Sequence, residues 1–169
     1  RSMMKEEEGT DRMKEIAEHV RKGAMAYLKQ QYKVVAIVFV VLAIVFAFMA
    51  YVLKVQNPWV PFAFLTGGLF SGLAGFFGLK TATYASARTA NGARTGLDKG
   101  LKIAFRSGAV MGLVVVGLGL LDIAIWFIVL NAVYQGESTA LVTITTTMLT
   151  FGMGASTQAL FARVGGGIY

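Results

Sequence analysis

Two polar residues in this sequence lie where side-chain chemistry inside an apolar environment is conceivable. Asp122 is the only acidic residue within four long apolar stretches of the chain, and Ser156 lies in the last of these stretches. Ionisable side chains within a membrane are costly, and they often mark the routes of ions or protons. We therefore take Asp122 and Ser156 as candidates for an intramembrane polar site.

A less specific interpretation of Asp122 stays open. A helix that starts near Gly108 places Asp122 past the middle of the membrane, and the surrounding leucines and isoleucines offset the cost of inserting it. Asp122 would then be tolerated beside local partners. The last apolar stretch indicates either a bundle interior or a water-filled route, because it carries many polar residues: Thr139, Thr143, Thr145, Thr146, Thr147, Thr150, Ser156, Thr157 and Gln158.

The sequence contains few residues that are suited to other kinds of functional site. The chain has no cysteine and one histidine, His19, which we interpret as a surface residue of a charged helix. Disulfides, cysteine metal sites and paired-histidine zinc sites are therefore excluded. The sequence contains no Ser-His-Asp triad, no carboxylate pair and no P-loop. We expect no catalytic residue, cofactor ligand or metal ligand within these 169 residues.

The composition indicates what holds these residues in place. The chain is 56% hydrophobic and 15% charged, whereas a soluble domain carries roughly a quarter charged residues. Four stretches reach the length of about 20 apolar residues that a membrane-crossing helix needs. The sequence therefore predicts an all-α, polytopic membrane helix bundle with four transmembrane helices, at residues 34–53, 59–79, 108–130 and 139–162.

The basic residues predict an orientation. Eight Lys and Arg precede the first span, six lie in the loop 80–107, and Arg163 follows the last span, whereas Lys54 alone lies on the opposite side. Cytoplasmic loops carry such an excess of positive charge. We therefore expect the N-terminus, the loop and the C-terminus to be cytoplasmic in a multi-pass membrane protein. A nucleic-acid partner is not expected, because the charge of +7 follows the topology.

The segments outside the spans are also expected to be largely helical. Residues 1–33 form a cytoplasmic tail and an amphipathic helix, which begins at Asp11 and leads into the first span of the membrane region 34–169. We expect residues 1–10 to be frayed. The basic loop 80–107 is interpreted as two helical extensions with a turn near Asn91-Gly92. Its charges either set the topology or meet an anionic ligand or lipid headgroups.

Small residues predict how the spans pack. Glycines allow helix backbones to approach closely where lipid provides no hydrophobic drive. The second span has Gly68 and Gly72 at this spacing, and the third has Gly108 and Gly112. The first span is bulky on nearly all sides. We expect the first span to face lipid and the other three to face protein.

Four sequence strings resemble those of membrane-integral, ion-translocating inorganic pyrophosphatases. In the order in which that family carries them, they are KGAMAYLKQQY at 22–32, GLAGFFGLKTATYASARTANGAR at 72–94, AFRSGAVMGLVVVGLGLL at 104–121 and GASTQALFARVGGGIY at 154–169. The strings are similar to the family's second to fifth membrane helices. The resemblance implies that the chain is an N-terminal part of such a protein, without its first helix and the helices after the fifth.

The resemblance also implies a function. Members of this family are homodimers that hydrolyse pyrophosphate bound with Mg²⁺, some with K⁺, and couple this to pumping of protons, sodium or both. The carboxylates that hold Mg²⁺ follow Tyr169, so we expect the 169 residues alone to be inactive. Arg163 matches a family arginine between the hydrolytic site and the ion gate. There it would place a fixed positive charge beside a carboxylate.

The expected partners are lipid, a second subunit and the remaining membrane helices of the same protein. A different hypothesis is a self-contained four-helix membrane protein that serves as a transporter subunit or scaffold. A third is an adaptor on a membrane surface or nucleic acid, built on the basic loop. The sequence leaves open which ion is pumped and whether potassium is required.

Overall fold

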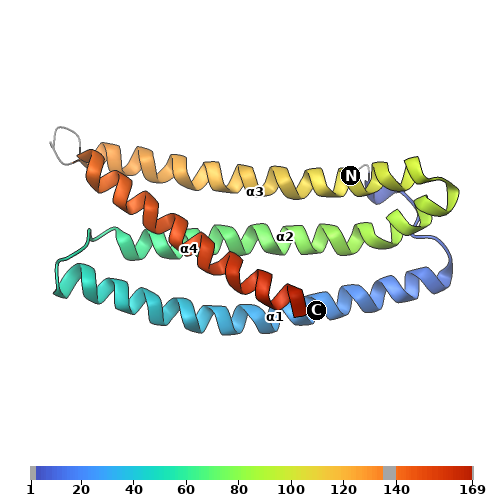
Figure 1. The fold of residues 1–169 in the computed structure, drawn as a ribbon, viewed down its shortest axis with the longest axis horizontal. Coiled ribbons are helices and arrows are strands. Elements are labelled where there is room, and N and C mark those ends of the chain that lie inside the picture. The colour runs from blue at the N-terminus through green and yellow to red at the C-terminus, as the bar shows by residue number, and fades with distance from the viewer. Residues whose placement is uncertain (1–2, 135–139, 169) are drawn as a thin grey trace. The chain divides into compact units, whose positions relative to one another are not determined.

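The chain folds into long helices. The computed structural model describes residues 3–134 and 140–168, with side chains up to Val164. The regular elements are η1 (Met3–Lys5), α1 (Asp11–Ala47), the π-helical turn η2 (Phe48–Val52), α2 (Val60–Thr95), α3 (Leu97–Val133) and α4 (Ala140–Ile168) (Figure 1). No strand occurs in the described ranges, and the predicted all-α class is confirmed.

Within the described residues, three segments are long and apolar enough to cross a membrane: Asp11–Val52, Val60–Thr95 and Leu97–Val133. Helix α4 is not among these three. It has 29 residues, which is ample length, but its six threonines lower its hydropathy. Thr139, with which the fourth span was expected to begin, lies outside the described residues. The crossing of a membrane by α4 stays a prediction.

The helices extend well beyond the expected spans. Helix α1 runs without a break from Asp11 into the apolar stretch, as the absence of proline indicated. In the segment 80–107, only Gly96 lies outside a helix, so α2 and α3 form a tight hairpin. The turn expected near Asn91-Gly92 was misplaced. Gly92 serves packing instead, since a Cβ there would lie 2.8 Å from Cδ1 of Ile103 and 3.4 Å from the backbone of Gly100.

The chain divides into two compact units. Unit 1 comprises Arg1–Gln30 and Ala74–Val116, and unit 2 comprises Gln31–Leu73 and Gly117–Tyr169. Unit 1 holds the charged parts of α1, α2 and α3. Unit 2 holds the apolar part of α1, the first half of α2, the second half of α3 and all of α4.

The interior of unit 2 consists of two apolar clusters. In the first, the rings of Phe39 and Phe64 stack with their centroids 4.8 Å apart, beside the buried Val35. The second joins α2, α3 and α4 through Ala63, Trp126, Leu130 and Ile144, with Trp59, Tyr134, Met148 and Phe151 packed against it. The aromatic residues Trp59, Trp126 and Tyr134 thus belong to a single cluster.

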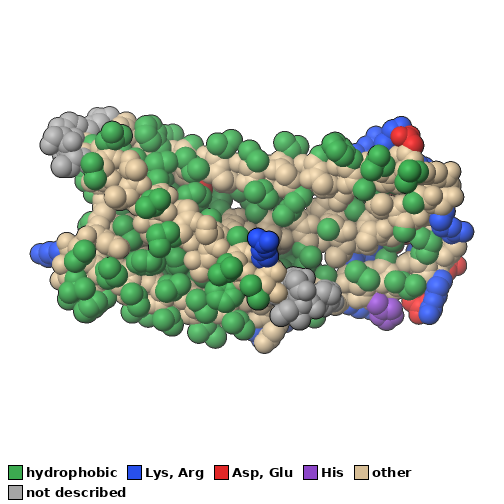
Figure 2. Space-filling model, viewed as in Figure 1, with side chains coloured by type: hydrophobic (Ala, Val, Ile, Leu, Met, Phe, Trp, Pro, Cys, Tyr) green, Lys and Arg blue, Asp and Glu red, His purple; other side chains and the backbone are tan. Residues whose placement is uncertain are grey.

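Large apolar side chains also cover the outside of the helices. Figure 2 shows them along much of the visible face. Ile37 and Ile44 on α1, and Leu113 and Ile128 on α3, are each more than 60% exposed. Exposure of so much apolar surface to water is unfavourable, whereas its contact with the hydrocarbon tails of lipids costs no free energy. This surface fits a protein that is embedded in a membrane.

The expected division into lipid-facing and protein-facing spans holds only in part. Of the most apolar stretch of each helix, 17% is buried in α1 and in α3, against 33% in α2. Within this chain, a Cβ added at Gly108 or Gly112 would meet nothing within 4 Å. Among the described residues, α3 therefore does not pack through these glycines, and their packing against other parts of the protein stays a prediction. Glycines at this spacing create a helix face that allows close packing, but they do not show that another helix packs against it.

Candidate functional site

Asp122 lies in a polar contact between α2 and α3. Asp122 is only 2% exposed, although many other side chains of α3 are exposed. One turn further along α3, the indole Nε1–H of Trp126 donates a hydrogen bond of 2.9 Å to the hydroxyl of Thr66. That hydroxyl in turn donates to the carbonyl oxygen of Ala63 at 3.1 Å. Asp122 thus joins a small hydrogen-bonded group at the edge of the apolar cluster.

The surroundings of Asp122 provide one polar neighbour and leave one atom unpaired. The carboxyl group contacts the side chain of Thr66. The Oδ2 atom is buried and has no hydrogen-bond partner among the described residues. An unpaired polar atom in an apolar interior costs about 1–3 kcal/mol. Thr66 is a local partner of the kind that would allow an aspartate to be tolerated inside a membrane. The unpaired oxygen of Asp122 retains the capacity to bind a proton or a cation.

Ser156 and Arg163 lie on α4, and both are exposed in this chain. Neither lies in the contact formed by Asp122, Thr66 and Trp126. The described structure therefore does not bring the three candidate residues into one site. Their assignment, Arg163 to a gate and Asp122 and Ser156 to an intramembrane polar site, stays a prediction.

The polar side chains of α4 lie only partly in the interior of the helix bundle. Thr147, Thr150 and Gln158 are buried. Most threonine hydroxyls of α4 donate a hydrogen bond to the carbonyl oxygen four residues earlier on the same helix. Threonine hydroxyls within helices commonly satisfy their hydrogen-bonding capacity in this way. These threonines are Thr145, Thr146, Thr147, Thr150 and Thr157. Gln158 has no such local bond, and its amide faces Gly72 of α2.

Helices α2 and α4 approach closely where both carry small residues. A side chain at Gly67 would collide with the carbonyl oxygen of Phe151, and one at Gly154 would collide with that of Phe64. One turn after Gly67, the hydroxyl of Ser71 donates to the carbonyl oxygen of Ala155 at 3.2 Å. This contact fixes α4 against α2 within unit 2. The role of Gly67 was not predicted, although the small residues at 67 and 71 have the helical spacing that indicates such a contact.

Helix α1 joins the same region through a hydroxyl group. The phenol of Tyr32 donates a hydrogen bond of 2.6 Å to the carbonyl oxygen of Gly72. The ring of Phe39 fills the space beside Gly68, where any Cβ would overlap it. The first span, expected to face mainly lipid, thus contributes a packed edge to unit 2.

In unit 1, an ion network attaches the N-terminal segment to α1 and α2. The carboxylate of Glu8 pairs with Arg21 at 2.8 Å and with Arg88 at 2.9 Å. The Nε of Arg88 donates to the carbonyl oxygen of Glu6, and the amide of Asn91 donates to that of Glu7. The hydrogen bond from Arg21 is the main cause that lowers the pKa of Glu8 below its ordinary value. The expectation of a frayed start is wrong for residues 3–10, because a buried arginine needs these acceptors.

No three His, Asp or Glu side chains gather as metal ligands in the described part of the chain. Mg²⁺ prefers carboxylates and phosphate oxygens in an octahedral arrangement. The described residues therefore do not fit a magnesium ion.

Comparison with known proteins decides the family. The family described as "Inorganic H+ pyrophosphatase" matches residues 1–169, the whole chain. This chain belongs to the inorganic H+ pyrophosphatase family. The resemblance noted in the four sequence strings is thereby confirmed, and the alternative of an unrelated four-helix protein is set aside.

Several curated members of the pyrophosphatase family are similar over the whole chain. A candidate K(+)-stimulated pyrophosphate-energized sodium pump of Bacteroides thetaiotaomicron is 70% identical over 100% of the chain. A K(+)-insensitive pyrophosphate-energized proton pump of Methanosarcina mazei is 40% identical over 100% of the chain. A candidate K(+)-stimulated sodium pump of Clostridium tetani is 44% identical over 98% of it. The chain spans about a quarter of the length of these relatives: 24%, 23% and 22%.

Proposed function

We propose that this chain is part of an integral membrane pump that hydrolyses pyrophosphate and uses the released energy to move ions across the membrane. The observation that carries the proposal is the match of the family to residues 1–169, together with relatives named as pyrophosphate-energized pumps. The long apolar helices fit a pump embedded in lipid. The role assigned to these helices is to pack against the remainder of the pump and position it.

Sodium is the ion that the comparisons favour. The relative with 70% identity is named as a potassium-stimulated sodium pump, and so is the relative with 44% identity, while the proton pump from Methanosarcina mazei has 40%. We therefore assign sodium transport with potassium stimulation to the protein. Proton transport without potassium stimulation is the alternative.

The substrate in this proposal is pyrophosphate with Mg²⁺, held by carboxylates from parts of the protein outside residues 1–169. The contribution of this chain to coupling is Arg163, whose charge on the exposed side of α4 is available to a carboxylate of another helix. An arginine is suited to this role, because its planar fork of donors matches a carboxylate and stays charged at any physiological pH.

The proposed topology follows from the basic residues. The N-terminus, the α2–α3 hairpin around Gly96 and the end of α4 lie in the cytoplasm, and the turn between η2 and α2 lies outside. Fifteen Lys and Arg then fall on the cytoplasmic side and one, Lys54, on the other. The proposed partners are lipid, the remaining membrane helices and a second copy of the whole protein.

The test is ion uptake driven by pyrophosphate in inverted vesicles that carry the complete protein. We expect pyrophosphate to drive uptake of radioactive sodium, potassium to stimulate it, and a protonophore to leave it intact. Acidification of the vesicles in place of sodium uptake would transfer the assignment to protons. Hydrolysis without uptake of either ion would overturn the proposed pump.

A further inference from the structure

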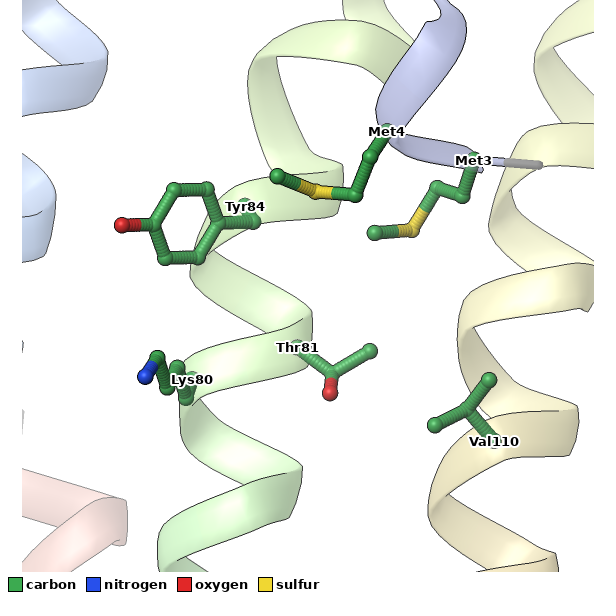
Figure 3. Close-up of a pocket in the computed structure, with 6 residues that line it drawn as sticks. All are labelled: Met3, Met4, Lys80, Thr81, Tyr84 and Val110. Atoms are coloured by element: carbon green, nitrogen blue, oxygen red, sulfur yellow. The ribbon is translucent and has the colours of Figure 1, made fainter. Parts of the chain in front are cut away.

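Unit 1 contains a cavity to which the proposed function assigns no role. It has a volume of about 380 Å³ and lies between η1 and the facing parts of α2 and α3. Its lining consists of Met3, Met4, Lys80, Thr81, Tyr84 and Val110 (Figure 3). Figure 3 shows the two methionine side chains reaching down from η1 and Thr81 pointing toward Val110.

The lining is amphipathic. Two thioether chains, one isopropyl group and the ring of Tyr84 provide apolar walls, while Lys80 supplies a positive charge and Thr81 a hydroxyl. A soluble anion would gain little from the apolar walls, and a neutral apolar molecule would make no use of the charge. The chemistry that matches both parts is a hydrocarbon chain joined to an anionic head.

The cavity lies where the apolar stretches of two helices end. Lys80 is the first charged residue after the uncharged stretch that begins at Trp59, and Val110 follows Arg106 by one helical turn. In a bilayer this is the level at which acyl chains meet phosphates, and basic side chains there extend toward the headgroups. Basic pockets between membrane helices at this level bind anionic lipid headgroups.

Lys80 has no carboxylate partner among the described residues. Other cations of unit 1 do have one: Arg88 pairs with Glu8, Lys99 with Glu6 and Lys102 with Asp98. The ammonium of Lys80 instead lies over the ring of Phe76, 5.8 Å from its centroid. A cation in this position keeps its hydrogen-bond donors available for an anion at the cavity.

We propose that this cavity binds one anionic glycerophospholipid. The phosphate lies at the ammonium of Lys80 and the hydroxyl of Thr81, an acyl chain runs past Val110 toward the membrane, and Met3 and Met4 cover the headgroup from the cytoplasmic side. The lipid thereby attaches the N-terminal segment to the helical hairpin of unit 1. This inference depends on the membrane location of the chain and does not depend on which ion the protein pumps.

The test is photocrosslinking on the complete protein in nanodiscs, with phosphatidylglycerol that carries a diazirine on its acyl chain. We expect crosslinks on the peptide that contains Val110, and competition by unlabelled phosphatidylglycerol but not by phosphatidylcholine. Lys80→Gln should weaken binding about fivefold, which corresponds to ~1 kcal/mol for one basic residue at an anionic surface. Val110→Trp should fill the cavity and remove these crosslinks.

Lys102→Gln is the matched control. It removes the same charge from the same basic segment, but Lys102 is exposed, pairs with Asp98 and does not line the cavity. We expect its crosslinks to equal those of the wild type. Equal crosslinking in Lys80→Gln and the wild type would overturn the proposal, as would equal competition by phosphatidylcholine. The absence of saturable crosslinks in the wild type would show that another segment of the protein fills the cavity, and it would also overturn the proposal.

Discussion

The guanidinium of Arg88 lies 2.9 Å from the carboxylate of Glu8, and both side chains are largely shielded from solvent. Arg88 belongs to a stretch of α2 that is otherwise rich in small residues, whereas Glu8 precedes α1. The same carboxylate also pairs with Arg21. One acidic side chain thus holds the N-terminal segment, α1 and α2 together in unit 1.

Glu8→Gln should destabilise the protein by about 1–3 kcal/mol, because it leaves Arg21 and the buried Arg88 without their anion. The measurement is the thermal unfolding midpoint of the purified protein in detergent. Glu7→Gln is the control, since Glu7 uses its backbone carbonyl to accept the bond from Asn91 and its side chain is exposed. Equal midpoints for Glu8→Gln and Glu7→Gln would show that the network contributes nothing.

The same carboxylate should make the stability depend on pH. Arg21 lowers the pKa of Glu8 in the folded state below its ordinary value of 4.5. The stabilisation is therefore fully present above the pKa of the unfolded chain and is lost as the pH falls through the lower pKa of the folded state. Wild type should lose stability more steeply than Glu8→Gln in this acidic range. Parallel losses in the two proteins would assign the pH dependence to other groups.

Two glycines, Gly154 in unit 2 and Gly112 in unit 1, should differ sharply in their tolerance of a methyl group. Gly154→Ala should cost about 1–3 kcal/mol, because the new Cβ overlaps the backbone of Phe64 in a packed contact. Gly112→Ala meets nothing in this chain and should be neutral or stabilising by about 0.5–1 kcal/mol, since alanine favours the helix. Thermal midpoints in detergent distinguish the two. A large loss for Gly112→Ala would show that another part of the protein covers this face of α3.

Asp122 should tolerate removal of its charge better than removal of its polar group. Asp122→Asn keeps an oxygen beside Thr66, so we expect near wild-type hydrolysis, ion uptake and thermal midpoint. Asp122→Ala removes the partner and leaves a cavity, which should cost about 2 kcal/mol. Ion uptake lost in Asp122→Asn while hydrolysis persists would instead place Asp122 on the ion route.

Arg163→Ala should reduce pyrophosphate-driven ion uptake about tenfold, the equivalent of ~1.4 kcal/mol in the barrier. Arg163→Lys should recover only part of the loss, because a point charge does not replace a planar fork of donors. Arg12→Ala is the control, since Arg12 is exposed and pairs only with its helical neighbour Glu15. Wild-type uptake in Arg163→Ala would reduce Arg163 to an anchor at the membrane surface.

The topology can be tested with single cysteines, because these 169 residues contain none. Ser86 on α2 and Val55 after η2 are both exposed. In inverted vesicles of a cysteine-free protein, an impermeant maleimide should label Ser86→Cys without treatment and Val55→Cys only after permeabilisation. The reverse pattern would place the basic segments outside the cytoplasm.

The sequence by itself determined the helices and their membrane environment. An uncharged stretch such as 34–53 is stable in lipid only as a helix, because every backbone group there must find its partner within the segment. The absence of proline between Asp11 and Val34 likewise made α1 continuous. These are local properties, and composition and spacing are enough to predict them.

Tertiary structure decided which small residues are packed and which charges are paired. Gly112 and Gly154 look alike in the sequence, yet only Gly154 meets another backbone, because only there does a second helix cross. The turn lies at Gly96 and not at Gly92, since Gly92 is needed against Gly100 and Ile103. The pairing of Glu8 with Arg88 also depends on tertiary structure. Contacts between segments distant in the sequence depend on how the helices are placed in space, and no local pattern of residues specifies that placement.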